Sequence, residues 1–221
     1  MKPLILFTGI VGLAMLTMSN VLQKPLTEGV LQYEISIVSA KNEPTTVNSL
    51  NGAILTLSLK PDMSRSDMKS SLGSESTVFN SSTASGFILK EYSGQKLMIT
   101  MTEANWDQKN KTNENLSFTV SNETTVIGNY TCKKAVATMA DGKLFTVYYD
   151  PSVVIANKKY NNAFSKLQGL PVQYEIQSGN LTFKYTLKNL SYESVPASKF
   201  EAPKSGYRVM TYEENQQLKK G

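Results

Sequence analysis

The chain of 221 residues contains no histidine and a single cysteine, Cys132. Without histidine there is no Ser-His-Asp triad, no Cys-His dyad and no histidine-ligated metal site. With one cysteine there is neither a Cys-x-x-Cys redox pair nor a disulfide within the chain. We therefore expect a protein that uses no metal and no cofactor and that lacks the commonest catalytic groups.

Charge is scarce as well. Charged residues make up 19% of the chain, and the net charge is only +5. The basic residues are scattered rather than gathered on one face with stacking aromatic residues, which argues against a nucleic-acid partner. Hydrophobic residues make up 40% of the chain. This composition is typical of one globular domain, since a domain usually has roughly 100–200 residues.

Long apolar runs are absent except at the N-terminus. Lys2 precedes an apolar run at residues 4–16, and the polar residues Ser19 and Asn20 follow it. A basic start and about a dozen apolar residues are typical of a secretory signal, and the run is short for a membrane-spanning helix. We expect residues 1–20 to be a cleaved signal peptide, with an uncleaved anchor as the alternative. The mature protein would then be periplasmic or secreted, with no transmembrane span.

The remaining chain alternates apolar and polar residues with a period of two, which is typical of a half-buried strand. Leu31, Tyr33 and Ile35, for example, alternate with Gln32 and Glu34. No crossover helix is long enough for a parallel sheet. The pattern predicts a mainly β protein with a large curved antiparallel sheet, a half-barrel or open barrel of about nine to eleven strands with one or two short helices. The other strand-like runs lie at residues 55–59, 87–91, 97–101, 116–120, 135–139, 144–149, 172–176 and 181–187.

Two further patterns complete the expected organisation. Residues 158–167 carry apolar side chains at helical spacing, and Gly169 and Pro171 end this short predicted helix. Polar stretches rich in Ser, Thr and Asn predict loops at residues 41–51, 67–84 and 104–115. We expect one antiparallel β domain at residues 21–212, followed by a polar C-terminal tail at residues 213–221.

Few residues suggest catalysis. Cys132 lies in a strand-like segment, where a lone cysteine behaves as a small hydrophobe; an exposed position beside Lys133 would make it reactive or allow pairing with a second chain. The Ser-x-x-Lys spacings at Ser66 and Ser93 lie outside helical patterns and lack the companion motifs of penicillin-recognising enzymes. The acidic residues are dispersed, so no two carboxylates are paired by their spacing. We expect no enzyme.

The apolar stripes of the strands are the remaining candidate site. They are regular enough to line one shared concavity, which is either a packed core or an open cavity for an acyl chain or another apolar ligand. Each methylene buried in such a cavity would contribute about 0.8 kcal/mol. Our candidate ligand-binding residues on this face are Tyr33, Ile35, Leu57, Ile99, Phe118, Tyr148, Tyr174 and Phe183.

Five segments of the chain, taken together and in order, form a recognisable set of motifs. They are E-G-V-L-Q-Y-E-I (28–35), I-G-N-Y-T-C-K-K-A (127–135), Y-Y-D-P (148–151), L-Q-G-L-P-V-Q-Y-E (167–175) and V-P-A-S-K-F-E-A-P-K-S-G-Y (195–207). They resemble the motifs of a family of exported bacterial proteins of unknown function related to the GLPGLI proteins. Where those proteins carry G-L-P-G-L-I, this chain reads G-L-P-V-Q-Y at residues 169–174. The resemblance implies a fold similar to the Lol-type lipoprotein carriers of the Gram-negative envelope, with a curved antiparallel sheet around a hydrophobic cavity.

Two hypotheses of function follow. The first is an exported, non-catalytic envelope protein that binds or carries a hydrophobic, lipid-like ligand in a concave cavity of the sheet. The alternative is a structural or protein-interaction module of the cell envelope, with a fully packed core and an envelope protein as its partner. An open cavity would favour the first hypothesis, and an exposed apolar patch or a bare sheet edge would favour the second.

Overall fold

The computed structural model describes residues 23–39, 50–111, 116–139, 142–178 and 181–218. The predicted signal peptide at residues 1–20 and most of the predicted loop at residues 41–51 lie outside the described residues. Fourteen strands and two α-helices occur within the described part of the chain. Twelve of the strands form one sheet, and the other two, β1 (Lys24–Leu26) and β11 (Val153–Ile155), pair with each other in parallel.

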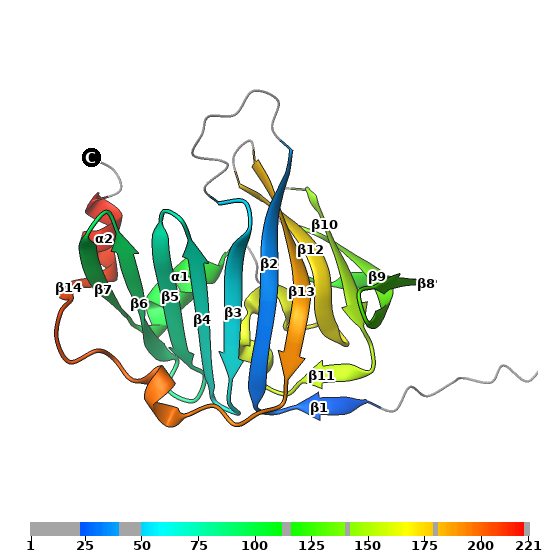
Figure 1. The fold of residues 1–221 in the computed structure, drawn as a ribbon, viewed down its shortest axis with the longest axis horizontal. Coiled ribbons are helices and arrows are strands. Elements are labelled where there is room, and N and C mark those ends of the chain that lie inside the picture. The colour runs from blue at the N-terminus through cyan, green and yellow to red at the C-terminus, as the bar shows by residue number, and fades with distance from the viewer. Residues whose placement is uncertain (1–22, 40–49, 112–115, 140–141, 179–180, 219–221) are drawn as a thin grey trace, which may run out of the picture.

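The large sheet is built from two antiparallel meanders that meet where β2 pairs with β13 (Figure 1). A short last strand, β14 (Arg208–Thr211), adds in parallel to the outer edge of β7, so β14 and β8 are the two edges of the sheet. The first meander consists of β2 (Gly29–Ser39), β3 (Ala53–Leu59), β4 (Met63–Ser70), β5 (Gly73–Asn80), β6 (Ser85–Tyr92) and β7 (Gln95–Met101). The second consists of β8 (Phe118–Ile127), β9 (Tyr130–Thr138), β10 (Leu144–Asp150), β12 (Leu170–Ser178) and β13 (Leu181–Ser191).

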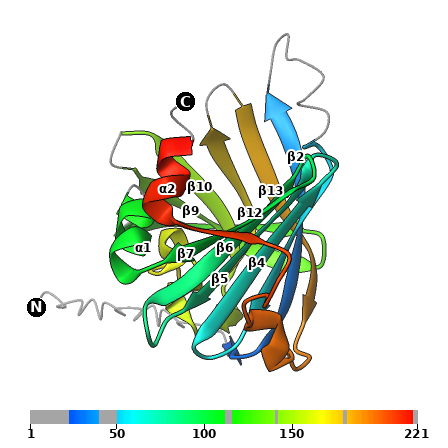
Figure 2. The ribbon, with the colours of Figure 1, turned by 90° about the vertical axis from the view of Figure 1, so that its left-hand side faces the viewer.

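The sheet is strongly curved and does not close, as Figures 1 and 2 show. The pairing of β2 with β13 contains two register shifts, and such bulges bend strands and increase their twist. The concave side holds α1 (Glu103–Asn110) and the 3-10 turns η2 (Lys158–Tyr160) and η3 (Asn162–Phe164). The prediction of a large, open, antiparallel sheet is confirmed, with twelve strands in place of nine to eleven.

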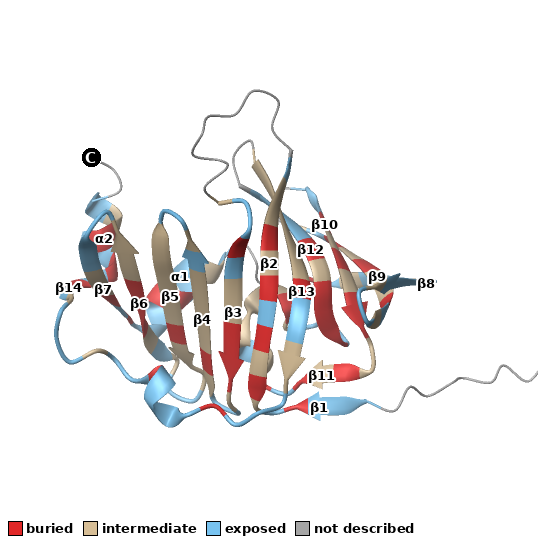
Figure 3. Ribbon diagram, in the orientation of Figure 1, coloured by how far each residue is buried: buried red, intermediate tan, exposed pale blue. Residues whose placement is uncertain are grey.

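The main core lies on the concave face, and along β2 buried residues alternate with more exposed ones (Figure 3). Leu31, Leu57 and Val172 are buried in this core, which also contains Phe164 of η3. Cys132 is fully buried in the same core, and burial raises the pKa of its thiol to about 11. The lone cysteine is therefore a protonated core residue at neutral pH.

The convex face of β4 to β6 is also covered. After β13 the chain crosses this face through the 3-10 turn η4 (Ala197–Phe200) before it reaches β14. We call residues 192–207 the crossing segment. Val195 and Phe200 of this crossing segment pack against Phe87 and Leu89 of β6. Strand β6 is thus buried on both sides, with Phe87, Ile88 and Leu89 all buried, whereas the period-two pattern predicts water on one side.

Strands β4 and β5 occupy residues that we predicted to be a loop at 67–84. They carry polar side chains on both faces, so no apolar alternation marks them in the sequence. Ser66 and Thr77 are cross-strand neighbours on the concave face. Arg65 and Asp67, one position to either side of Ser66, form an ion pair with a 2.8 Å N–O distance.

Helix α1 lies within the predicted loop at residues 104–115 and begins with a capping box. The Asn105 amide donates to Thr102 Oγ1 at 3.3 Å, and the Thr102 amide donates to Asn105 Oδ1 at 3.0 Å. Such reciprocal bonds satisfy two donors at a helix start. Trp106 is the only large apolar residue of the helix, which therefore shows no amphipathic pattern.

The helix predicted at residues 158–167 is replaced by the two 3-10 turns. Asn157 Oδ1 accepts from the Lys159 amide at 3.2 Å, and Asn161 Oδ1 accepts from the Ala163 amide at 3.0 Å. Because asparagine bonds its own backbone two residues on, each of these residues starts a new turn and interrupts a continuous helix. We call residues 157–167 the covering segment.

The predicted polar tail also contains a helix, α2 (Tyr212–Leu218). The Thr211 amide donates to Glu214 Oε2 at 2.7 Å, and the Glu214 amide donates to Thr211 Oγ1 at 3.2 Å, a second capping box. Tyr212 is buried in a small core with Trp106 and Ile99. The apolar contact of Tyr212 and the capping together explain why this polar segment is ordered.

Glu28 fastens the crossing segment to the start of β2. Its Oε1 accepts from Lys60 Nζ at 2.7 Å, from the Val195 amide at 2.6 Å and from Ser194 Oγ at 2.9 Å. These hydrogen bonds lower the pKa of the Glu28 carboxyl from 4.5 to about 2, and the bond from Lys60 has the largest effect. Hydrogen bonds to the charged form favour that form.

We predict that Glu28→Gln lowers the free energy of unfolding at pH 7 and flattens its pH dependence in acid. A carboxyl whose pKa is depressed by folding stabilises the protein fully above pH 4.5 and loses that effect as the pH falls towards about 2. Urea unfolding at pH 7 and at steps below pH 4.5 measures both effects. Glu34→Gln, which removes an exposed ion pair with Lys188, is the control. Parallel loss of stability in wild type and Glu28→Gln below pH 4.5 would contradict the prediction.

Candidate functional site

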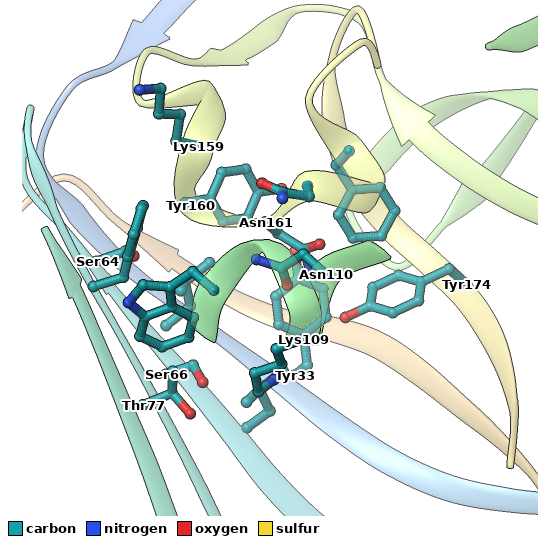
Figure 4. Close-up of a pocket in the computed structure, with 16 residues that line it drawn as sticks. Tyr33, Ser64, Ser66, Thr77, Lys109, Asn110, Lys159, Tyr160, Asn161 and Tyr174 are labelled. Atoms are coloured by element: carbon teal, nitrogen blue, oxygen red, sulfur yellow. The ribbon is translucent and has the colours of Figure 1, made fainter. Parts of the chain in front are cut away.

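Two adjoining cavities lie between the concave face of the sheet and the elements that cover it. The first cavity has a volume of about 270 Å³. Figure 4 shows Ser64, Ser66 and Thr77 on its sheet side, with Tyr160 and Asn161 of the covering segment opposite them. Its full lining is Tyr33, Leu55, Leu57, Ser64, Ser66, Thr77, Phe79, Trp106, Lys109, Asn110, Lys159, Tyr160, Asn161, Asn162, Phe164 and Tyr174.

The second cavity has a volume of about 400 Å³ and a more apolar lining. It lies where the start of β10 and the end of β12 meet the turn η3. Asn161 and Phe164 line both cavities, so these two side chains form the wall between them. The lining consists of Leu116, Met139, Lys143, Leu144, Phe145, Asn161, Ala163, Phe164, Glu175, Ile176 and Gln177.

Aromatic packing fixes the position of this wall. The Phe164 ring lies 4.9 Å from the ring of Tyr174 and 5.7 Å from that of Phe145, measured between centroids. Tyr174 in turn stacks on Tyr185 at 4.8 Å and meets the edge of Tyr33 at 5.9 Å. Each such aromatic pair contributes about 0.5–1.5 kcal/mol beyond the area it buries. Phe164 thereby anchors the covering segment to the sheet.

The first cavity contains polar groups with very different hydrogen bonding. Tyr33 donates its hydroxyl to the carbonyl oxygen of Pro171 at 2.7 Å. The Tyr160 hydroxyl and the Trp106 indole Nε1 are buried and have no hydrogen-bond partner in the described part of the chain. An unsatisfied buried donor costs about 1–3 kcal/mol. The cavity is therefore not organised for stability alone.

The charges at the first cavity are of one sign. Lys109 and Lys159 line it, and none of the described lining residues is acidic. Burial raises the pKa values of Tyr33, Tyr160 and Tyr174 well above the ordinary value, so all three phenols are neutral at any physiological pH. The cavity thus presents neutral hydrogen-bonding groups and positive charge.

Three of the eight residues predicted from the sequence come together at the first cavity, namely Tyr33, Leu57 and Tyr174. Ile35 is buried two positions along β2 from Tyr33 and lines neither cavity. Ile99 belongs to the separate small core beneath α1.

The last three predicted residues line neither cavity. Phe118 of the edge strand β8 packs on Phe145, with 6.2 Å between the ring centroids. Phe183 is half-buried. Tyr148 is also half-buried but lies on the convex face, because Val147 pairs with Tyr174 whereas Tyr148 pairs with Gln173. The period-two pattern thus selects the concave face except at Tyr148, and it does not select the part of that face that stays open.

Sequence reasoning missed the residues that cover the sheet. Trp106 falls in a predicted loop, and Tyr160 and Asn161 fall in a predicted helix. Ser66 and Thr77 fall in strands that carry no apolar pattern. One signal could have drawn attention to Trp106: it is the only tryptophan of the chain and stands in a polar stretch.

No family model and no curated protein matches the chain, so its resemblance to the GLPGLI-related family is unconfirmed. Several solved structures align with it. PNGF-II is 12% identical with a TM-score of 0.50, and the alignment covers 87% of this chain but only 33% of PNGF-II. An uncharacterized conserved protein from Thermus thermophilus is 9% identical, with coverages of 82% and 90% and a TM-score of 0.47. Mycobacterium tuberculosis lipoprotein LppX is 11% identical, with coverages of 77% and 89% and a TM-score of 0.39.

At these identities the likeness to PNGF-II concerns the fold alone, and this chain spans about a third of that protein. Within the described ranges, no helix has the length and apolar character needed to cross a membrane. The function must therefore be argued from the cavities themselves.

We predict that Tyr160→Phe and Tyr33→Phe have opposite effects on the ligand-free protein. Tyr160→Phe removes an unpartnered buried hydroxyl and should raise the free energy of unfolding by about 1 kcal/mol. Tyr33→Phe removes the bond to Pro171 and should lower it by about 1 kcal/mol. Urea unfolding measures both. Equal destabilisation by the two changes would show that the Tyr160 hydroxyl has a partner.

Proposed function

We propose that this chain is an exported, non-catalytic protein that binds or carries an apolar, lipid-like ligand on the concave face of its sheet. The observation that carries the proposal is the second cavity, an opening of about 400 Å³ bounded by Phe145, Phe164 and Ile176. Small-molecule sites are typically concave, largely apolar cavities of about 300–1,000 Å³. A site of this kind needs no catalytic group.

The mouth of the second cavity adds to the argument. Leu144 and Ile176 line it and are 71% and 42% exposed. Apolar side chains that stay in water beside a cavity gain free energy when a ligand covers them, at about 25 cal/mol per Å² of apolar surface. An alkyl chain entering here would bury these side chains and gain about 0.8 kcal/mol for each of its own methylenes.

The size of the cavity limits the ligand. A volume of about 400 Å³ suits a drug-sized molecule. We therefore propose one alkyl chain of medium length as the occupant, rather than a lipid with two long chains. The walls are largely preformed, because Phe164 is already fixed by its contacts with Tyr174 and Phe145. Preformed walls reduce the ordering cost of binding.

A second candidate function rests on the edge strand β8. Its Val120 and Val126 are 44% and 72% exposed, and β8 ends the strand order of the sheet within the described residues. An unpaired edge with exposed apolar side chains can add a strand from another protein. This favours a protein-interaction role, with an envelope protein as the partner.

We predict that the neutral probe N-phenyl-1-naphthylamine binds residues 21–221 saturably, with one site per chain, and that Ala163→Phe weakens this binding at least tenfold. Ala163 lines the second cavity, so a phenyl ring there occupies the space of the ligand. Burial of a whole apolar side chain corresponds to about 1.5–3 kcal/mol, which is roughly ten- to a hundredfold in affinity. A titration that follows the fluorescence of the probe measures its affinity and the number of sites.

Ala156→Phe is the matched control, because Ala156 is exposed just before the covering segment and lines neither cavity. It should leave probe binding unchanged. Probe binding that is not saturable, or that survives Ala163→Phe unchanged, would overturn the proposal. Native mass spectrometry of protein exported by a bacterial host should in addition detect an adduct of lipid mass that organic extraction removes.

A further inference from the structure

We propose that the first cavity binds the carboxylate of a fatty acid whose single alkyl chain lies in the second cavity. This inference rests on the proposed function and specifies the chemistry of its ligand. It starts from the contrast between the two cavities. The second has a largely apolar lining, whereas hydroxyl, amide and ammonium groups line much of the first.

Two unpartnered hydrogen-bond donors indicate which kind of head group the first cavity can bind. Trp106 is only 6% exposed, lines the first cavity, and has an indole Nε1 without a partner in the described part of the chain. An indole N–H can only donate. Tyr160 lines the same cavity, and its hydroxyl is likewise buried and unpartnered within the described residues. A ligand that satisfies both groups must bring hydrogen-bond acceptors.

The charges at this cavity favour a negatively charged head group over a neutral acceptor. Lys109 and Lys159 are positive, and the described lining contains no carboxylate that would repel a negative ligand. Lys159 Nζ donates to the carbonyl oxygen of Ser81 at 3.4 Å. A carboxylate has two oxygens and so can accept from Trp106 and Tyr160 together. A cationic head group would find no counter-charge among the described lining residues.

The shared wall links the two sites into one. Asn161 and Phe164 line both cavities, so the two cavities adjoin at these residues. In the proposed complex, an alkyl chain in the second cavity extends past these residues, and its head group lies in the first cavity. The unpartnered donors gain their hydrogen bonds only when the ligand is present, so binding stabilises the protein. The same requirement makes the site selective for ligands that carry hydrogen-bond acceptors.

The test uses the only tryptophan of the chain as a reporter. Protein labelled with ¹⁵N gives one indole N–H resonance, from Trp106, which is followed by NMR as dodecanoate is added below its micelle concentration. We expect a saturable downfield shift of the indole proton with dodecanoate. Dodecyltrimethylammonium, which has the same chain length and no acceptor, should not produce this shift.

Two variants connect the shift to affinity. Trp106→Phe and Tyr160→Phe should each weaken dodecanoate binding about tenfold or more, since a hydrogen bond to a charged group is lost. Both should retain binding of N-phenyl-1-naphthylamine, which has no carboxylate. Tyr92→Phe is the control, because Tyr92 lies at the end of β6 and lines neither cavity.

The outcomes separate this inference from the proposed function. If the naphthylamine probe binds but dodecanoate leaves the indole resonance and the variants' affinities unchanged, the carboxylate site is refuted and the apolar site stands. If dodecanoate shifts the resonance and the probe does not bind, the first cavity binds a carboxylate, but the placement of an alkyl chain in the second cavity is refuted together with the proposed function. If neither ligand has an effect, both proposals are wrong.

Discussion

The pairing of β2 with β13 is the contact on which the rest of the structure depends. It joins the two meanders into one sheet of twelve strands, and the pairing contains two register shifts, which bend and twist the strands. A sheet this wide cannot leave its concave apolar face in water. Among the described residues, the covering segment and α1 cover that face, and the polar-lined and apolar-lined cavities are where this cover is incomplete.

Much of the fold could be predicted because burial on one face imposes a period of two. The alternation of Leu31, Tyr33 and Ile35 identifies β2 and its buried face correctly. The polar strands β4 and β5 could not be found in this way, since Ser66 faces a cavity instead of a packed core. The parallel strand β14 depends on a long crossing over the convex face, which no local pattern encodes.

The candidate site was less accessible to sequence reasoning than the fold. Tyr33, Leu57 and Tyr174 could be chosen because they lie on the buried face of regular strands. Trp106 and Tyr160 reach the cavity from α1 and η2, and their places depend on how these elements dock on the sheet. Local asparagine bonds at Asn157 and Asn161 break the predicted helix and set the position of Phe164. Docking of this kind is a tertiary effect that overrides the local pattern.

The unpartnered donors and the incomplete cover fit one explanation: the empty protein tolerates unsatisfied groups that a ligand satisfies. The measurement that tests this most directly is a crystal structure of residues 21–221 grown with dodecanoate. The account predicts an alkyl chain between Phe145 and Ile176, with a carboxylate oxygen about 2.7–3.2 Å from Trp106 Nε1. A structure in which the covering segment fills both cavities, or in which dodecanoate lies elsewhere on the surface, would contradict it.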